Sequence, residues 1–316
     1  MLALGKKKFT GVSQFLARFR GWIQAGAALL TNLHLPNFLK GGLYQGAGKT
    51  VCVPGLNCYS CPAASGACPI GAFQAVVGSS KFSFSYYITG ILILLGVLLG
   101  RFICGFLCPF GWFQELLHKI PSRKLSTRKL KPLRYLKYAI LLVMVFLLPA
   151  FLVNDVGMGD PFFCKYLCPQ GVLEGAIPLS LANSGIRAAL GSLFTWKLGI
   201  LLVVIVLSVL FYRPFCKWIC PLGAFYALLN KVSLVQMKVD QSKCISCGKC
   251  AKACKMDVDV TKSPNHTECI RCGMCVRACP TNAVRFRCGF GTGKQGTVLP
   301  EKTNKQMNDI VKEKKS

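Results

Sequence analysis

The chain is poor in acidic residues, with 11 Asp and Glu against 39 Lys and Arg in 316 residues, and its net charge is +28. The basic residues alternate along the chain. Met1–Arg20 holds five, Cys104–Lys137 holds eight and the chain from Arg213 onward holds nineteen, whereas Lys40–Ser85 holds three and Asn154–Leu193 holds two. This alternation follows the positive-inside rule of membrane proteins. We therefore predict no nucleic-acid partner, and both termini on the cytoplasmic side.

Histidine is also scarce, with only His34, His118 and His266. These residues offer no convincing facing pair for a b-type haem, and His34 is better explained as a packing residue than as a quinone contact. The sequence contains no G-x-G-x-x-G loop after a strand, which excludes a Rossmann site for a nicotinamide or flavin. No general acid or base stands out, so the sequence leaves open whether the chain is an enzyme or an electron-transfer component of one.

Charged residues of both signs make up only 16% of the chain, hydrophobic residues make up 53%, and the mean hydropathy is +0.45. Four apolar runs approach the roughly 20 residues that cross a bilayer: Gly21–Phe38, Tyr86–Phe102, Tyr138–Val153 and Leu198–Tyr212. We predict an α-helical integral membrane protein with about four transmembrane helices. The alternative is three spans and a surface helix.

Eight of the nineteen cysteines form the strongest motif. The spacing C-x2-C-x2-C-x3-C occurs twice, at Cys244, Cys247, Cys250 and Cys254, and at Cys269, Cys272, Cys275 and Cys279. In this spacing three cysteines ligate one cluster and the fourth ligates the other. The segment resembles a small α+β bacterial-type 2[4Fe–4S] ferredoxin, with clusters on Cys244, Cys247, Cys250 and Cys279, and on Cys269, Cys272, Cys275 and Cys254. A zinc site also accepts four thiolates and is the alternative.

Three other segments carry C-x3-C-P-x-G, at Cys104/Cys108, Cys164/Cys168 and Cys216/Cys220. The related stretch "CYSCPAASGACPIGAF" contains Cys58, Cys61 and Cys68. Proline is favoured at the first position of a helix. We therefore predict short helices after the Cys-Pro pairs, with Cys108 and Cys220 at N-caps, where the helix dipole favours a thiolate.

The predicted topology sorts these cysteines onto two faces. Cys104/Cys108 end the second predicted span and Cys216/Cys220 end the fourth, so the two pairs are candidates for one further [4Fe–4S] cluster, the inner site. The opposite face holds candidates for an outer site: Cys58, Cys61, Cys68, Cys164 and Cys168, with Cys52 as a sixth. Three alternatives stay open, namely outer disulfides, redox-active thiol pairs and structural thiols. Cys52 and Cys288 have no clear role.

The inner cysteine pairs followed by the tandem ferredoxin motif resemble the NapH/NosR-type membrane polyferredoxins, over roughly Tyr86 to Cys279. The resemblance implies an electron conduit between the quinone pool or cytoplasmic donors and redox enzymes outside the membrane. Two features depart from the family. The outer cysteines exceed its two-motif pattern, and the covalent-flavin domain of NosR-type relatives is missing.

We expect four regions: an anchor helix and outer Cys-rich loop in 1–85, transmembrane helices with C-x3-C-P motifs in 86–235, the ferredoxin domain in 236–290, and a basic tail in 291–316. The predicted function is one-electron transfer at the inner membrane, between the ferredoxin module and the membrane or outer sites, a quinone or an external oxidoreductase. The ferredoxin module is basic, which favours an acidic cytoplasmic partner or the anionic inner leaflet. The alternative is that this charge only extends the positive-inside pattern.

The hydrocarbon core is roughly 30 Å thick, too thick for one efficient tunnelling step. The inner and outer sites must therefore sink into the bundle, or a quinone must connect them. A second hypothesis is a maturation or regulatory factor whose ferredoxin reduces the membrane thiol pairs to support an external metalloenzyme. A third is an anchoring subunit of a larger oxidoreductase.

Overall fold

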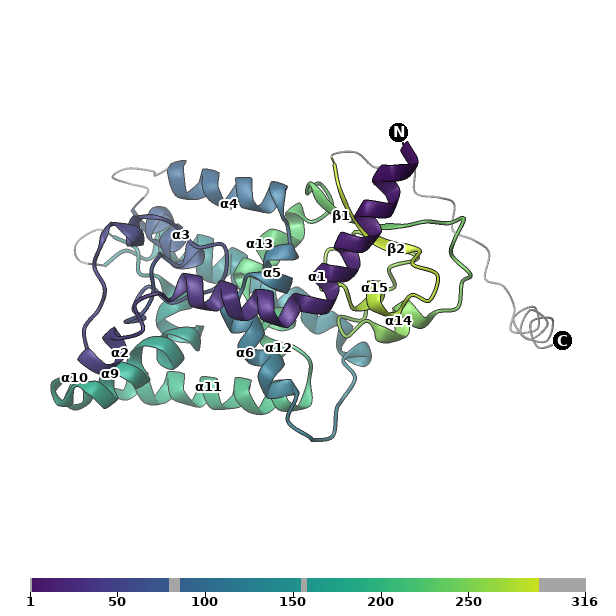
Figure 1. Cartoon of the computed structure of the whole chain (residues 1–316). Coiled ribbons are helices and arrows are strands. Elements are labelled where there is room, and N and C mark those ends of the chain that lie inside the picture. Colours follow the sequence, from purple (N-terminus) through teal and green to yellow (C-terminus); the bar gives the residue numbers. More distant parts are fainter. Residues whose placement is uncertain (1, 80–85, 155–157, 290–316) are drawn as a thin grey trace.

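The computed structural model describes residues 2–79, 86–154 and 158–289. In this part the chain is mostly helical, and its strands form one two-stranded sheet near the C-terminus. The predicted tail, 291–316, lies outside the described residues. Figure 1 shows an elongated molecule in which the sheet lies at one end, beside the N-terminus, and α2, α9 and α10 lie at the other.

The first half of the chain contains mostly short helices. In order these are α1 (Leu2–Thr31), α2 (Asn37–Lys40), η1 (Ala47–Thr50), α3 (Pro69–Gly78), α4 (Tyr86–Leu98), α5 (Phe102–Phe106), α6 (Pro109–His118), η2 (Arg128–Tyr135), α7 (Leu136–Ile140), η3 (Leu141–Leu147) and α8 (Leu148–Phe151). The helices α3 and α6 begin at the proline that follows a cysteine, and Cys108 is an N-cap as predicted.

The second half repeats this arrangement and adds the ferredoxin elements. It contains η4 (Phe163–Leu167), η5 (Val172–Ala176), α9 (Ile177–Ala182), α10 (Ser184–Ala188), α11 (Ser192–Leu210), α12 (Pro214–Trp218), α13 (Pro221–Leu229), β1 (Val235–Val239), α14 (Lys249–Ala253), α15 (Met274–Ala278) and β2 (Val284–Cys288). Cys220 is the predicted N-cap of α13, and its Sγ accepts a hydrogen bond from the N–H of Gly223 at 3.3 Å. Strands β1 and β2 are antiparallel, with Met237 opposite Phe286.

Two segments of the described residues are long and apolar enough to cross a membrane, Leu130–Phe151 and Ser192–Leu210. They contain most of the third and fourth predicted spans. The second predicted span is shorter than expected, because α4 ends at Leu98 and Gly100 adopts a left-handed φ of 55° that terminates helices. Only the first part of the first predicted span falls in α1, which extends back to Leu2 and ends at Thr31, before the predicted end at Phe38. The described residues thus confirm a mostly helical protein with two candidate spans, whereas the predicted count is four.

One apolar core joins the helical part to the ferredoxin domain. It combines Leu56, Phe110 and Val145 with Met256 and Ile270 from the C-terminal segment. A second core packs α1 against the sheet through Ala17, Met237 and Phe286, and the Oγ of Ser13 accepts the N–H of Phe286 at 3.1 Å. The ferredoxin domain is therefore packed against the helices rather than tethered to them.

Candidate metal centres

The inner site is built from two helix starts that face each other. Cys104 comes from α5, Cys108 caps α6, Cys216 lies in α12 and Cys220 caps α13. All four cysteines are buried and line one cavity of about 340 Å³. The other lining residues are apolar or glycine, with Tyr226 as the exception. The structure therefore brings together the four cysteines that the sequence assigned to this site.

Two buried guanidinium groups flank the inner site. Both Arg101 and Arg213 are 0% exposed. Arg213 donates to the carbonyl oxygen of Cys104, and the Nη2 of Arg101 donates to that of Cys216 at 3.5 Å. These cations offset part of the cost that burial imposes on a thiolate, and they complement a bound anionic group.

The outer site has the same plan. Cys58, Cys68, Cys164 and Cys168 line one cavity, which encloses about 1310 Å³ including its open mouth. The Nζ of Lys197 donates to the carbonyl oxygen of Cys164 at 3.0 Å, as Arg213 does to that of Cys104. The cavity is also lined by small and apolar residues such as Gly71, Ala72 and Leu179.

Three of the cysteines outside the ferredoxin motifs do not line these cavities. The Sγ of Cys61 lies 3.6 Å from Oδ1 of Asn32, and the residue belongs to a separate small core with Ala63 and Ala64. Cys52 is buried and forms an isolated bridge with Ala67, while Cys288 is exposed in β2. Every cysteine lies in the described residues, and the structure contains no disulfide among them.

The ferredoxin cysteines form two neighbouring groups. Cys244, Cys247, Cys250 and Cys279 line a cavity of about 330 Å³, close in size to that of the inner site. The thiols of Cys254, Cys269, Cys272 and Cys275 lie near enough to interact electrostatically, and Cys275 also interacts with Cys250 of the first group. Each half of the repeat thus contributes its last cysteine to the other group. This exchange is the one that the sequence spacing predicts.

The four groups of cysteines follow one another through the molecule. Between the second ferredoxin group and the inner site, a Cβ on Gly105 would overlap the carbonyl oxygen of Ile270 and lie 3.7 Å from the Cα of Cys272. Leu56, which is 1% exposed, lines both the inner and the outer cavity. A Cβ on its neighbour Gly55 would lie 2.8 Å from the Cα of Cys108. Leu56 is therefore a wall residue that the inner and outer sites share.

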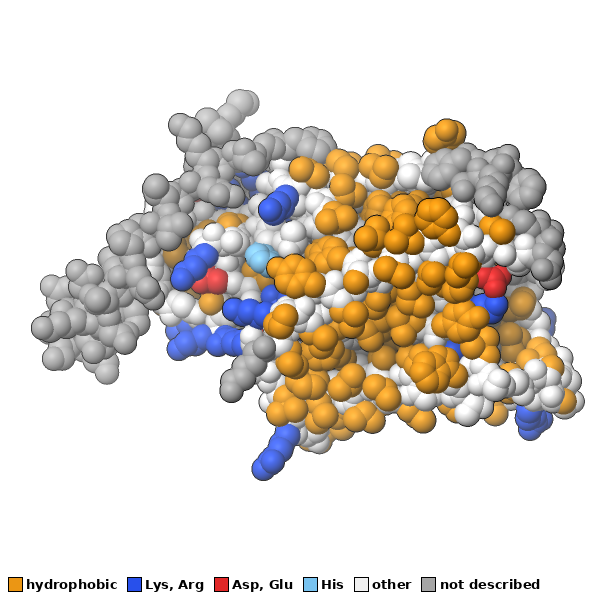
Figure 2. All heavy atoms as spheres, turned by 180° about the vertical axis from the view of Figure 1, so that it is seen from behind, with side chains coloured by type: hydrophobic (Ala, Val, Ile, Leu, Met, Phe, Trp, Pro, Cys, Tyr) orange, Lys and Arg blue, Asp and Glu red, His pale blue; other side chains and the backbone are white. Residues whose placement is uncertain are grey.

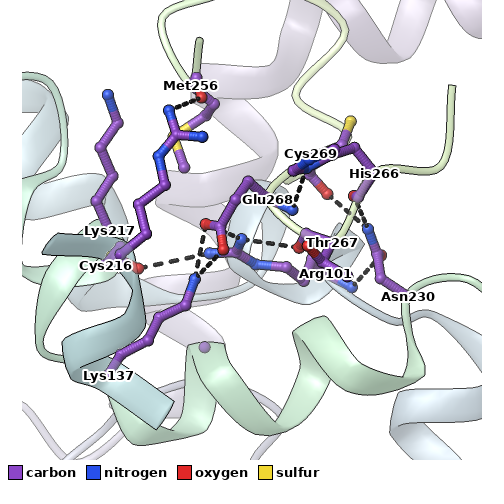
Figure 3. A network of polar contacts seen from close by, with 12 residues as sticks. Arg101, Lys137, Cys216, Lys217, Asn230, Met256, His266, Thr267, Glu268 and Cys269 are labelled. Carbon is purple, nitrogen blue, oxygen red and sulfur yellow. Dashed lines mark hydrogen bonds and ion pairs between the residues drawn. The ribbon is translucent and has the colours of Figure 1, made fainter. Parts of the chain in front are cut away.

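Buried ion pairs lock the ferredoxin domain onto the helices (Figure 3). The carboxylate of Glu268 accepts hydrogen bonds from the Nη1 of Arg101 at 2.9 Å and from the Nζ of Lys137 at 2.5 Å. Burial alone would raise the pKa of Glu268, but Arg101 and Lys137 lower it to about 2. Asp257 is paired in a similar way with Lys217 at 3.2 Å and Arg134 at 3.3 Å.

The donor sets fit iron–sulfur clusters. Each site offers four cysteines, the complement of one [4Fe–4S] cluster, and the inner cavity is otherwise almost wholly apolar. In the part of the chain that the structure describes, no three Cys, His, Asp or Glu side chains converge as ligands of a single metal ion.

Sequence reasoning missed the basic residues at these sites. Arg213 was counted only as a topology signal and Arg101 was placed in the second apolar run, yet both contact the backbone of the inner cysteines. The signal that the sequence offered was the position of the two arginines. Each stands three residues before the first cysteine of a C-x3-C-P motif, "RFICGFLCP" and "RPFCKWICP".

Comparisons with known proteins agree with this reading. A family model described as a 4Fe-4S binding domain matches four stretches, at residues 66–87, 83–128, 137–177 and 193–240. A second 4Fe-4S binding domain matches residues 237–258 and 263–285. The chain therefore contains several 4Fe-4S binding domains, including two beyond the inner pair of motifs, and [4Fe–4S] clusters are its cofactors.

Three relatives show the extent of the similarity. The uncharacterised protein MJ0750 of Methanocaldococcus jannaschii is 28% identical over 54% of this chain and 66% of its own length. The methylamine utilization ferredoxin-type protein MauN of Methylorubrum extorquens is 27% identical over 60% of this chain and 56% of its own length. The ferredoxin-type protein NapH of Haemophilus influenzae is 26% identical, covering 56% and 54% respectively. The match thus covers about half to two-thirds of each relative. No solved structure matches this chain.

Proposed function

The chain is related to the NapH-type 4Fe-4S ferredoxin-type proteins, and from that premise we propose that it conducts single electrons through a membrane. Two [4Fe–4S] clusters would be held by the ferredoxin cysteines, a third by the inner site, and a fourth by Cys58, Cys68, Cys164 and Cys168. Each bound cluster supplies a group that takes up and releases one electron. No residue of the chain then has to act as a general acid or base.

The observation that carries this proposal is the shared wall at Leu56, which lines both cavities. It supports a continuous series of redox sites from the ferredoxin domain to the far end of the helical part. The distance problem raised by a hydrocarbon core of roughly 30 Å disappears if the series crosses the membrane in short steps. Gly105, against Ile270 and Cys272, supports the same close approach on the ferredoxin side.

The surface supports a location in the membrane. Figure 2 shows a broad face covered by hydrophobic side chains, with Lys and Arg side chains concentrated toward one end. Exposed apolar residues on the candidate spans include Leu142, Phe146, Leu202 and Val206. Contiguous apolar surface of this extent requires a lipid or protein partner. We propose four spans in the inner membrane, with both termini and the ferredoxin domain on the cytoplasmic side, facing an acidic donor or acceptor protein.

The outer cavity favours electron exchange between the outer site and a partner that is not another cluster of this chain. It is larger than the inner cavity, and small and apolar residues line it together with a few polar ones such as Asn57 and Lys197. A cavity of this size and lining is typical of small-molecule sites. A quinone or a docked external oxidoreductase is therefore the proposed terminal partner, and its identity decides the direction of electron flow.

The proposal predicts electron transfer across vesicles. Purified protein in liposomes, given a membrane-impermeant reductant on the ferredoxin side, should reduce ferricyanide trapped inside. Empty liposomes are the control. Trapped ferricyanide that stays oxidised, while the ferredoxin clusters become reduced, would restrict the chain to one face of the membrane.

The outer ligand set predicts a difference between two nearby cysteines. Cys58→Ser should remove about four irons per chain, because Cys58 is the fourth thiol around the outer cavity. Cys61→Ser is the matched control and should keep the full iron content, since its Sγ contacts Asn32 instead. Iron analysis of both variants tests whether Cys58 or Cys61 belongs to the outer ligand set. Equal losses would return Cys61 to the ligand set.

A further inference from the structure

The four C-P-x-G segments share one more position, six residues after the cysteine that precedes the proline. It is occupied by Gln74, Gln114, Glu174 and Tyr226. The two glutamines are 0% exposed, and amides are rarely buried without partners. Each of the two amides contacts the opposite half of its site, in addition to any contact within its own helix.

Gln114 of α6 reaches the half that contains Cys216. Its Oε1 accepts the N–H of Phe215 at 3.2 Å, and its Nε2 donates to the Sγ of Cys216 at 3.2 Å. A backbone N–H can only donate, so the oxygen must face Phe215. This fixes the amide orientation and directs an N–H at the sulfur.

Gln74 of α3 makes the same pair of contacts at the outer site. Its Oε1 accepts the N–H of Phe163 at 3.0 Å, and its Nε2 donates to the Sγ of Cys164 at 3.2 Å. In both sites the glutamine thus contacts the first cysteine of the facing C-x3-C-P motif and the residue before it. The inner and outer sites thus have the same pair of glutamine hydrogen bonds although their sequences differ, which argues that both sites require these contacts.

The residues at this sixth position in the second half of each site also make contacts outside their own helices. Glu174, from the second half of the outer site, accepts the N–H of Cys58 with its Oε2 at 3.0 Å. Tyr226, from the second half of the inner site, donates its hydroxyl to the carbonyl oxygen of Pro54 at 3.0 Å, two residues before the wall residue Leu56. At three of the four positions the side chain therefore contacts the opposite half of its own site, whereas Tyr226 contacts the segment that separates the inner and outer cavities.

We propose that Gln114 and Gln74 are positioning residues that hold the two halves of the inner and outer sites together and set the reduction potential of the cluster in each. This inference rests on the proposed function, in which Cys216 and Cys164 are cluster ligands. A hydrogen bond to a ligand sulfur withdraws negative charge from a cluster, and such bonds are among the determinants of its potential. Loss of the bond shifts the potential to more negative values.

The test uses the full-length protein, purified anaerobically, and two substitutions at each glutamine. Gln114→Glu keeps an oxygen for the N–H of Phe215 but replaces the N–H at the sulfur with a second oxygen, whereas Gln114→Leu removes both contacts. Gln74→Glu and Gln74→Leu are the matched pair at the other site. Potentiometric EPR titration follows each cluster separately. Gln114 variants should lower the midpoint potential of the inner cluster alone, and Gln74 variants that of the outer cluster alone.

Other outcomes also decide the matter. Loss of about four irons and of the inner signal alone in a Gln114 variant supports the proposal, because the two halves of the inner site have then separated. Unchanged potentials in both variants of a site, or equal changes at both sites from one substitution, overturn it. Wild-type protein with only about eight irons would overturn the proposed function and this inference together. Full iron content with unshifted potentials would overturn this inference alone.

Discussion

Glu268→Ala is expected to release the ferredoxin domain from the helices. The substitution leaves Arg101 and Lys137 buried without their shared carboxylate, and both side chains are 0% exposed. Removing one partner of a buried pair costs about 3–5 kcal/mol, against a total stability of roughly 5–15 kcal/mol for a domain. We expect a protease to release a fragment containing the ferredoxin cysteines from this variant but not from the wild type.

The matched control is Asp160→Ala. Asp160 pairs with Lys165 at 2.5 Å, but both side chains are more than a third exposed, and exposed pairs contribute little. Limited proteolysis of the two variants and the wild type in the same detergent makes the comparison. If Glu268→Ala resists cleavage as well as Asp160→Ala does, the ion pairs in Figure 3 do not hold the domain in place.

Cys216→Ser is expected to interrupt electron transfer at the inner site. The four cysteines around that cavity come from two helix pairs, so Cys104→Ser should remove the same EPR signal. Each variant should lose about four irons and the vesicle activity, while the ferredoxin signals remain. Loss of a whole redox centre within the series has a larger effect than any change of potential.

Cys288→Ser is the control for this pair, because Cys288 is exposed and lines none of the cavities. It should keep the iron content and the vesicle activity of the wild type. Full iron content in Cys104→Ser and Cys216→Ser, with fewer thiols open to alkylation, would instead favour the thiol relay of a maturation factor.

The sequence predicted the groupings that depend on spacing. The C-x2-C-x2-C-x3-C repeats indicate which cysteine each half gives to the other, because short loops fix the local geometry. The inner set followed from topology, since Cys104/Cys108 and Cys216/Cys220 both end apolar runs. The Cys-Pro helix starts at Cys108 and Cys220 followed from the preference of proline for the first helical turn.

The sequence could not predict features that depend on how loops fold back. The segment from Pro54 to Cys58 was assigned to an outer loop, yet Gly55 and Leu56 pack against the inner site. Choosing Cys58 over Cys61 also depends on that path, since the two are only three residues apart. The predicted count of four spans was not confirmed for a related reason. Hydropathy shows apolar runs, but it does not show that Gly100 ends the second run in a turn.

Iron and acid-labile sulfide per chain, measured on anaerobically purified protein together with EPR of the reduced form, test the central claim most directly. Four clusters predict about sixteen irons and as many sulfides, with signals from four centres. About eight irons would mean that only the ferredoxin clusters exist. The membrane cysteines would then be thiols or disulfides, and the series of sites across the membrane would be wrong.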